Sequence, residues 1–285
     1  MKQGFKTNAI LIGILSILVG CILSCSEVSA KEYKLKNNYY GGSCSVVISK
    51  DKVYYSITET GCIYCYNMKT KKTKTVAKAK GNGFSCLKKK GNYLYAVYDS
   101  YQGSDGCNLS IVRVSIKSGK KTTLAKGCNY ILAGNKIYYT KTKRVKSEYG
   151  GYDKELGTYS MTLTGKNKKS AKGVKINTER DAKSKIIGSK GSLYTKGKTK
   201  NNYYMSKSLH FDSRGGKSTV IYDILSDSNA TTYATIEYYT LQGNYIVYKK
   251  NVKDNKYGAV GQLVLVKTDG TNAKVIYSRP SVSGW

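Results

Sequence analysis

A short run of apolar and aromatic residues, restarting after a two-residue turn, recurs five times along the chain. The copies read DKVYYSI, GNYLYAV, GNKIYYT, KGSLYT and GNYIVY, and they begin at residues Asp51, Gly91, Gly134, Lys190 and Gly243. These first residues are 40, 43, 56 and 53 positions apart. Such a period is typical of repeat folds whose units are small β-sheets. The pattern therefore predicts an all-β chain built from successive copies of one sheet.

Each copy divides into four short strands separated by turn residues. The predicted strands are 44–49, 53–57, 63–67 and 73–77 in the first unit, 85–89, 93–98, 109–116 and 122–125 in the second, and 235–240, 245–249, 263–267 and 274–277 in the last. Gly-Asn and Asp-Gly pairs between such runs favour tight hairpins, because the turn residues there must adopt positive φ angles.

Consecutive apolar residues such as Val53, Tyr54 and Tyr55 indicate sheets that are covered on both faces, as the blades of a β-propeller are. The 28 tyrosines fit the space between blades, because the ring packs like phenylalanine while the hydroxyl reaches a partner. We expect a β-propeller of five four-stranded blades, forming a single domain over residues 31–285. A polar insertion occupies 141–156, and six blades is the alternative if another blade lies within 173–240.

The first 30 residues have the pattern of a secretory signal peptide. Lys2 and Lys6 precede an apolar run over 9–23, and small residues end at Ala30, where we expect cleavage. The run is too short to cross a membrane as a helix, which needs about 20 residues, and no later stretch approaches that length. In the alternative reading, the lipobox-like LVGC at 18–21 makes Cys21 a lipid anchor. Both readings predict an extracellular protein, secreted or attached to the cell surface, with no transmembrane segment after processing.

Six cysteines follow the signal, and an even number in an exported chain predicts disulfide bonds, with 15 pairings open. They are Cys44, Cys62, Cys65, Cys86, Cys107 and Cys128. Cys62 and Cys65 have the spacing of a redox pair, but residues three apart in a strand point to opposite faces. A zinc site needs a second cysteine pair or a nearby histidine. We expect the cysteines to cluster at one rim of the propeller, with no metal bound.

The chain carries a formal charge of +32, and only five of its 49 basic residues are arginines. Lysine is a hydrated point charge suited to diffuse attraction, whereas arginine favours bidentate recognition. The hairpin turns predict a basic face on the rim opposite the cysteines. Its lysines are Lys69, Lys71, Lys72, Lys74, Lys117, Lys120, Lys121, Lys166, Lys168 and Lys169. In the alternative reading, these lysines are simply the solvated tips of hairpins.

The recurring GNKIYY unit, followed by a strand and a KTDG-like turn, resembles an uncharacterised bacterial family of exported proteins. That family has a β-propeller similar to the one in low-density-lipoprotein-receptor-related proteins. The best copy covers 243–277 and includes LVLVKTDG at 263–270. The resemblance implies a propeller in an exported protein and brings no catalytic residue with it. The receptor signature Tyr-Trp-Thr-Asp is absent, so receptor-like partners do not follow.

The residues that catalysis usually needs are scarce. His210 is the only histidine, and we expect it on a strand face with one hydrogen bond. Asp99 and Asp105 lie in a loop that matches no trusted calcium signature. The chain therefore predicts a binding propeller without catalytic residues or cofactor, whose partner is an anionic cell-wall polymer, a polysaccharide or a surface protein. Nucleic acid would bind only non-specifically. The alternative is a carbohydrate-active propeller enzyme, a glycoside hydrolase or polysaccharide lyase, which needs two carboxylates.

Overall fold

The computed structural model describes residues 32–34, 39–40, 44–57, 60–102, 107–146, 151–177, 185–200, 203–230, 236, 238–254, 256 and 258–280. Over these residues the chain is all-β, apart from the single-turn 3-10 helix η1 (Ile224–Ser226). The described part contains no helix that is long and apolar enough to cross a membrane. The all-β prediction is therefore confirmed. The predicted signal peptide (1–30), its cleavage residue Ala30 and the alternative anchor Cys21 lie outside the described residues.

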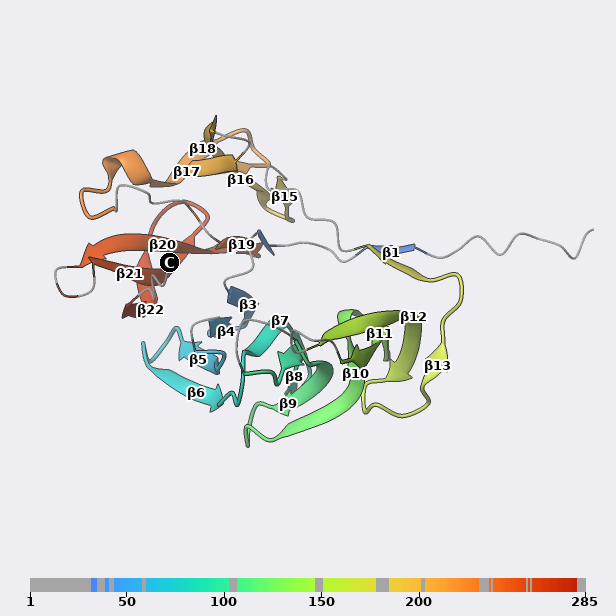
Figure 1. The fold of residues 1–285 in the computed structure, drawn as a ribbon. Helices are drawn as coiled ribbons and strands as arrows, with labels where there is room; N and C mark the ends of the chain where they lie inside the picture. The colour runs from blue at the N-terminus through green and yellow to red at the C-terminus, as the bar shows by residue number, and fades with distance from the viewer. Residues whose placement is uncertain are drawn as a thin grey trace, which may run out of the picture.

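The strands form five antiparallel units of four strands each within the described ranges (Figure 1). The first unit is β3 (Cys44–Ser49), β4 (Lys52–Ile57), β5 (Ile63–Asn67) and β6 (Thr73–Ala77). The second is β7 (Gly83–Lys90), β8 (Tyr93–Asp99), β9 (Leu109–Ser115) and the first half of β10 (Lys121–Ala133). The third is the second half of β10, β11 (Lys136–Val145), β12 (Tyr152–Thr162) and β13 (Lys169–Ser170).

The remaining strands complete the fold. The fourth unit is β15 (Ile186–Ile187), β16 (Gly191–Lys200), β17 (Tyr203–Ser213) and β18 (Ser218–Asp223). The fifth is β19 (Tyr238–Gln242), β20 (Tyr245–Asp254), β21 (Gly258–Lys267) and β22 (Lys274–Pro280), to which β2 (Tyr39–Tyr40) adds a strand beside β19. Separately, β1 (Glu32–Lys34) pairs in parallel with β14 (Lys175–Asn177). The segment 173–240 thus contributes one four-stranded unit, and the described residues hold no sixth.

β10 belongs to two units at once. Lys126 pairs with Ser110 of β9, whereas the next residue, Gly127, pairs with Lys141 of β11. The strand therefore changes partner between these two residues and joins the second and third units into one seven-stranded sheet. The predicted insertion 141–156 is largely paired: β11 and β12 continue the hairpin outwards as far as the pair of Val145 and Tyr152. The segment therefore extends two strands of the third unit and is not a separate loop.

The two turns within a unit are joined by a recurring hydrogen bond. In the first unit, the backbone N–H of Met68 donates to the carbonyl oxygen of Asp51 over 2.8 Å. The equivalent bonds run from Ile116 to Asn92, from Arg214 to Lys190 and from Thr268 to Asn244. They hold the turn between the first two strands against the turn between the last two. We call the edge of the units that carries these turns the turn rim.

Four hydrophobic clusters fill the spaces between sheets and join the first unit to the second and fifth, the second to the third, and the fourth to the fifth. Tyrosines are among the largest fully buried side chains, and they include Tyr55, Tyr95, Tyr130, Tyr139, Tyr238 and Tyr239. A fully buried large side chain contributes about 1.5–3 kcal/mol relative to exposure. The predicted packing of tyrosine between covered sheets is confirmed.

Polar side chains add specific links between neighbouring units. The hydroxyl of Tyr95 donates to the carbonyl oxygen of Leu163 over 3.1 Å, which joins the second unit to the third. The side-chain amide of Gln242 accepts from the N–H of Ile48 at 2.7 Å and donates to the carbonyl oxygen of Val46 at 2.9 Å. That amide ties the first strand of the fifth unit to the first strand of the first. The first and fifth units are therefore neighbouring sheets.

Candidate anion-binding cleft

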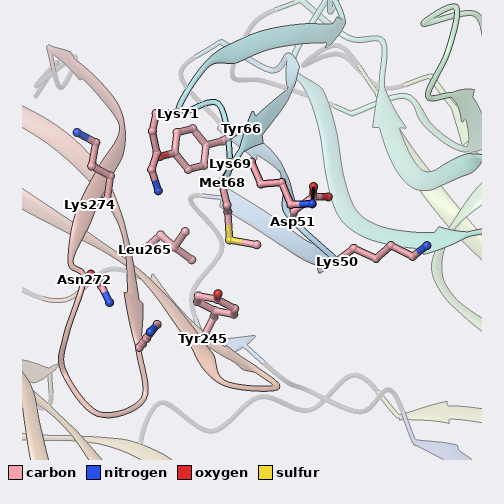
Figure 2. Close-up of a pocket in the computed structure, with 11 residues that line it drawn as sticks. Lys50, Asp51, Tyr66, Met68, Lys69, Lys71, Tyr245, Leu265, Asn272 and Lys274 are labelled. Carbon is pink, nitrogen blue, oxygen red and sulfur yellow. Dashed lines mark ion pairs between the residues drawn. The ribbon is translucent and has the colours of Figure 1, made fainter.

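A cleft of about 470 Å³ lies between the first and fifth units at the turn rim (Figure 2). Its walls come from the turns of both units, which are remote in sequence. The lining residues are Lys50, Asp51, Tyr66, Met68, Lys69, Lys71, Tyr245, Leu265, Lys267, Asn272 and Lys274. Five lysines and one carboxylate thus line the cleft together with partly apolar walls. This composition suits an anion with some apolar surface.

Local turn chemistry sets the position of the cleft's lysines. The side-chain oxygen of Asn67 accepts from the backbone N–H groups of Lys69 at 2.9 Å and Thr70 at 3.2 Å, as an Asx turn does. Lys71 then adopts a φ of 59°, and Lys50 a φ of 54° in the first turn of the unit. A left-handed conformation costs a residue with a β-carbon roughly 1 kcal/mol or more. The hydrogen bonds of the turns offset that cost and hold both lysines at the rim.

The one acidic group in the lining is already engaged. The ammonium of Lys69 lies 3.4 Å from a carboxylate oxygen of Asp51. A backbone hydrogen bond within the turn, together with Lys69 and Lys52, holds the pKa of Asp51 below its ordinary value. Because this pair is solvent-exposed, its contribution to stability is small. It leaves Lys50, Lys71, Lys267 and Lys274 as the uncompensated positive charge of the lining.

Tyr66 supplies a neutral donor to the same cleft. Its side chain is only 3% exposed, and within the described structure its hydroxyl has no hydrogen-bond partner. Burial raises the pKa of Tyr66, so the hydroxyl keeps its proton at neutral pH. A buried hydroxyl without a partner costs about 1–3 kcal/mol. An anion that accepts from this hydroxyl would recover part of that cost.

The ten lysines predicted for the basic face are all exposed in the structure. They lie at the turn rim of the first three units, and of these only Lys69 and Lys71 line the cleft. The ammonium of Lys121 lies 3.1 Å from the centre of the Tyr98 ring, so it is partly committed to a cation–π contact. The sequence reading missed Tyr66, Lys267 and Lys274. These three residues enter the site because the fifth unit packs against the first, and the spacing of residues along the chain carries no signal for that contact.

Some of the cysteines lie near the edge of the units opposite the turn rim, whereas Cys65 lies inside β5 and Cys86 inside β7 rather than at a strand start. Cys62 directly precedes β5, Cys107 precedes β9, and Cys128 follows the point where β10 changes partner. The thiols of Cys62, Cys65, Cys86, Cys107 and Cys128 are free in the structure, and the side chain of Cys44 lies outside the described part. The described residues contain no group of three or more histidine, cysteine or acidic side chains that could hold a metal ion. Disulfide pairing stays a prediction.

His210 lies on β17 and is buried at 9% exposure. Its Nε2 is 2.7 Å from the hydroxyl oxygen of Ser208, and its ring stacks on Tyr194 with centroids 5.6 Å apart. Burial first, and then the charge of Lys196, lowers the pKa of His210, which keeps the ring neutral at pH 7. The structure thus gives it the expected place on a strand face.

The carboxylates with shifted pKa values are held in their ionised form. Burial acts to raise the pKa of Asp227, but the Lys250 ammonium at 2.6 Å, the N–H of Asn229 and the hydroxyl of Tyr222 bring it below its ordinary value. Hydrogen bonds from Ser218, Lys185 and Tyr194 do the same for Asp212. A glycosidase acid needs a raised pKa. The pKa values of these two carboxylates are lowered instead.

The loop around Asp99 is held by its own hydrogen bonds. One carboxylate oxygen accepts from the N–H groups of Tyr101 at 3.0 Å and Asn108 at 2.8 Å, and the other accepts from the Asn82 amide at 3.1 Å. Asp105 lies outside the described residues. The carboxylate of Asp99 therefore organises the connection between β8 and β9.

No family model matches this chain, and no curated protein matches it. Among solved structures, the crystal structure of the tricorn protease is similar over 85% of this chain, at 10% sequence identity and a TM-score of 0.32. The similarity spans 22% of that protein's length. A likeness of this size transfers neither fold nor activity. The function must be argued from the chain's own residues.

Proposed function

We propose that this chain is an exported five-bladed β-propeller that binds an anionic polymer of the cell envelope at its turn rim and catalyses no reaction. The observation that carries the proposal is the cleft between the first and fifth units, which is lined by five lysines and by Tyr66, whose buried hydroxyl has no partner in the described structure. Its ligand is a repeating phosphate or carboxylate polymer.

Propeller geometry is supported by the stacking of the units. Their strands follow one another in simple meanders, and the hydrophobic clusters lie between the faces of successive sheets. The first unit packs against the last through a cluster that includes Tyr55, Tyr238 and Leu263. In the proposed ring, the β1–β14 pair lies beside the third blade, since β14 contacts β10 and β11.

A polymer fits this rim better than a single small anion. The exposed lysines extend from the cleft across the turns of the second and third units. Each contact with an exposed lysine is weak and salt-sensitive, but several contacts along one chain act together. The cleft would hold one anionic group of the polymer, and the neighbouring turns would hold the groups that follow.

The experiment measures retention on immobilised poly(glycerol phosphate) along a salt gradient. The triple variant Lys71→Gln, Lys267→Gln and Lys274→Gln removes charge from the cleft. A matched triple variant, Lys78→Gln, Lys154→Gln and Lys253→Gln, removes the same charge from exposed positions outside the cleft lining. We expect the cleft variant to elute at clearly lower salt than the matched one. Equal elution of the two variants would show that only net charge matters, and the cleft assignment would be wrong.

A further inference from the structure

Cys107 and Cys128 lie just beyond the last paired residues of β9 and β10, Ser110 and Lys126. Lys126 of β10 pairs with Ser110 of β9, so continuing the same register places Cys128 opposite Asn108, next to Cys107. Opposed residues in an antiparallel pair are about 5 Å apart, and one further residue adds about 3.4 Å along the strand. The resulting separation of roughly 6 Å lies within the Cα range that disulfides span.

The backbone at both cysteines is fixed by hydrogen bonds that do not involve sulfur. The N–H of Asn108 donates to the Asp99 carboxylate at 2.8 Å, and the N–H of Leu109 donates to the Asp153 carboxylate at 2.7 Å. On the other strand, a register shift lies between Cys128 and Tyr130, where Asn129 has a φ of 45°. The first two contacts fix the backbone just after Cys107, and the pairing of Cys128 with Thr140 of β11 fixes the backbone at Cys128.

The surroundings of the Cys128 thiol include Cys107. The thiol of Cys128 lies 3.8 Å from a carboxylate oxygen of Glu155, and charges at Asp153 and Cys107 act on it as well. Both cysteines are partly exposed, so a small oxidant can reach them. By contrast, Cys65 is only 4% exposed and packs within the cluster between the first two units.

We infer that Cys107 and Cys128 form a disulfide bond that ties the start of β9 to β10 where β10 passes from the second unit to the third. The bond closes a loop that contains the rest of β9 and the turn after it. Its effect is to lock the junction between two units that share a strand. The inference is independent of polymer binding, because the pair lies on the edge opposite the turn rim.

The bond forms by thiol–disulfide exchange with a disulfide oxidant such as glutathione disulfide or an exported disulfide oxidoreductase. The thiolate of Cys107 attacks one oxidant sulfur, and the oxidant's sulfur–sulfur bond breaks to release one thiolate. Cys128 then loses its proton and attacks the sulfur of Cys107, which expels the second oxidant thiolate. The two cysteines lose two electrons and two protons in total, and the oxidant is reduced to two thiols.

Cys107 has the attacking role because Cys128 is the poorer nucleophile. Burial, followed by the charge and hydrogen bond of Glu155, raises the pKa of Cys128 to about 12. A thiol with so high a pKa is protonated at neutral pH, and only the thiolate attacks a disulfide. The mixed disulfide with the oxidant should therefore form first on Cys107.

The test is non-reducing peptide mapping of the full chain after reduction and reoxidation with glutathione disulfide. We expect the peptides that carry Cys107 and Cys128 to be joined to each other, both in the unaltered chain and in a Cys62→Ser control. Free thiols at both positions, or linkage of either one to a different cysteine, would overturn the inference.

A thermal unfolding measurement makes the test independent of mapping. Oxidation should raise the Tm of the unaltered chain by about 5 °C over the reduced form. The Cys107→Ser, Cys128→Ser double variant should lose that redox-dependent shift, whereas Cys62→Ser should keep it. An equal shift in the double variant would assign the stabilising bond to other cysteines.

Discussion

The hydroxyl of Tyr55 donates a hydrogen bond to the carbonyl oxygen of Ile276, which is 3.0 Å away in space and 221 residues later in the chain. Tyr55 lies on β4 of the first unit and Ile276 on β22 of the fifth. The ring of Tyr55 also stacks on Tyr64 and meets Tyr277 edge to face. One side chain thus joins the two ends of the repeat by packing and by a directional bond.

We predict that Tyr55→Phe lowers the free energy of unfolding by about 1–2 kcal/mol. The ring keeps its packing, but the carbonyl of Ile276 loses this donor. Urea unfolding measures the change. Tyr152→Phe is the control, because Tyr152 is 54% exposed and should give a change near zero. Equal stability of the two variants would mean that the bond between the first and last units contributes nothing.

Gly83→Ala should be severely destabilising. Gly83 has a φ of 95°, and a β-carbon there would lie 2.1 Å from the Cα of Gly61 in the first unit. Gly157 is a matched control, since its φ is 99° and an added β-carbon would meet nothing within 4 Å. We expect Gly157→Ala to cost about 1–2 kcal/mol from backbone strain alone, and Gly83→Ala clearly more. Thermal unfolding of both variants provides the comparison, and equal losses would contradict the close approach of the two units.

Tyr66→Phe should separate binding from stability. The variant removes a buried hydroxyl that has no partner in the described structure, so stability should stay unchanged or rise by about 1 kcal/mol. Retention on poly(glycerol phosphate) should nevertheless weaken, because the cleft loses its neutral donor. A variant that binds as well as the unaltered chain would remove Tyr66 from the proposed site while leaving the lysines in it.

Alkylation of Cys128 in the reduced protein should be slow until the pH approaches about 12, the value to which burial and Glu155 raise its pKa. Only the thiolate is alkylated, so the rate increases as the thiol loses its proton. Glu155→Gln removes a carboxylate that disfavours the thiolate, and it should shift the alkylation profile to lower pH. Lys154→Gln is the control and should not shift it in that direction. An unchanged profile in Glu155→Gln would show that burial alone sets the reactivity.

The raised pKa of Cys128 also predicts a loss of stability at high pH in the reduced protein. The thiol keeps its proton in the folded chain up to about pH 12, whereas in the unfolded chain it loses the proton near its ordinary value of 9. Deprotonation therefore favours the unfolded state as the pH rises through that window. Below pH 9 the group is protonated in both states and has no such effect.

Strand positions followed closely from the sequence where alternation and turn residues agreed. The predicted strands 44–49, 63–67 and 73–77 have the same bounds in the structure. Predicted and observed strand bounds agreed less well where one strand pairs with strands of two units. The predicted 122–125 became the 13-residue β10, because a strand that continues past its hairpin into the next sheet leaves no turn signal at the change of partner.

The candidate cleft was only half visible in the sequence. Lysines at hairpin tips were predicted from turn chemistry, and Lys69 and Lys71 do line the cleft. In the sequence, Tyr66 cannot be told apart from the other strand tyrosines. The residues next to it along the chain do not show whether its hydroxyl finds a hydrogen-bond partner in the fold. Lys267 and Lys274 enter the same cleft only because the last unit packs against the first.

The sequence by itself determined the repeating sheet, its hairpins and its basic turns, since these depend on residues close together along the chain. Tertiary structure decided which units are neighbours, whether the Tyr66 hydroxyl finds a partner and which residues line the cleft. Those outcomes depend on contacts between residues up to 221 positions apart. The spacing of residues within one repeat does not predict such contacts.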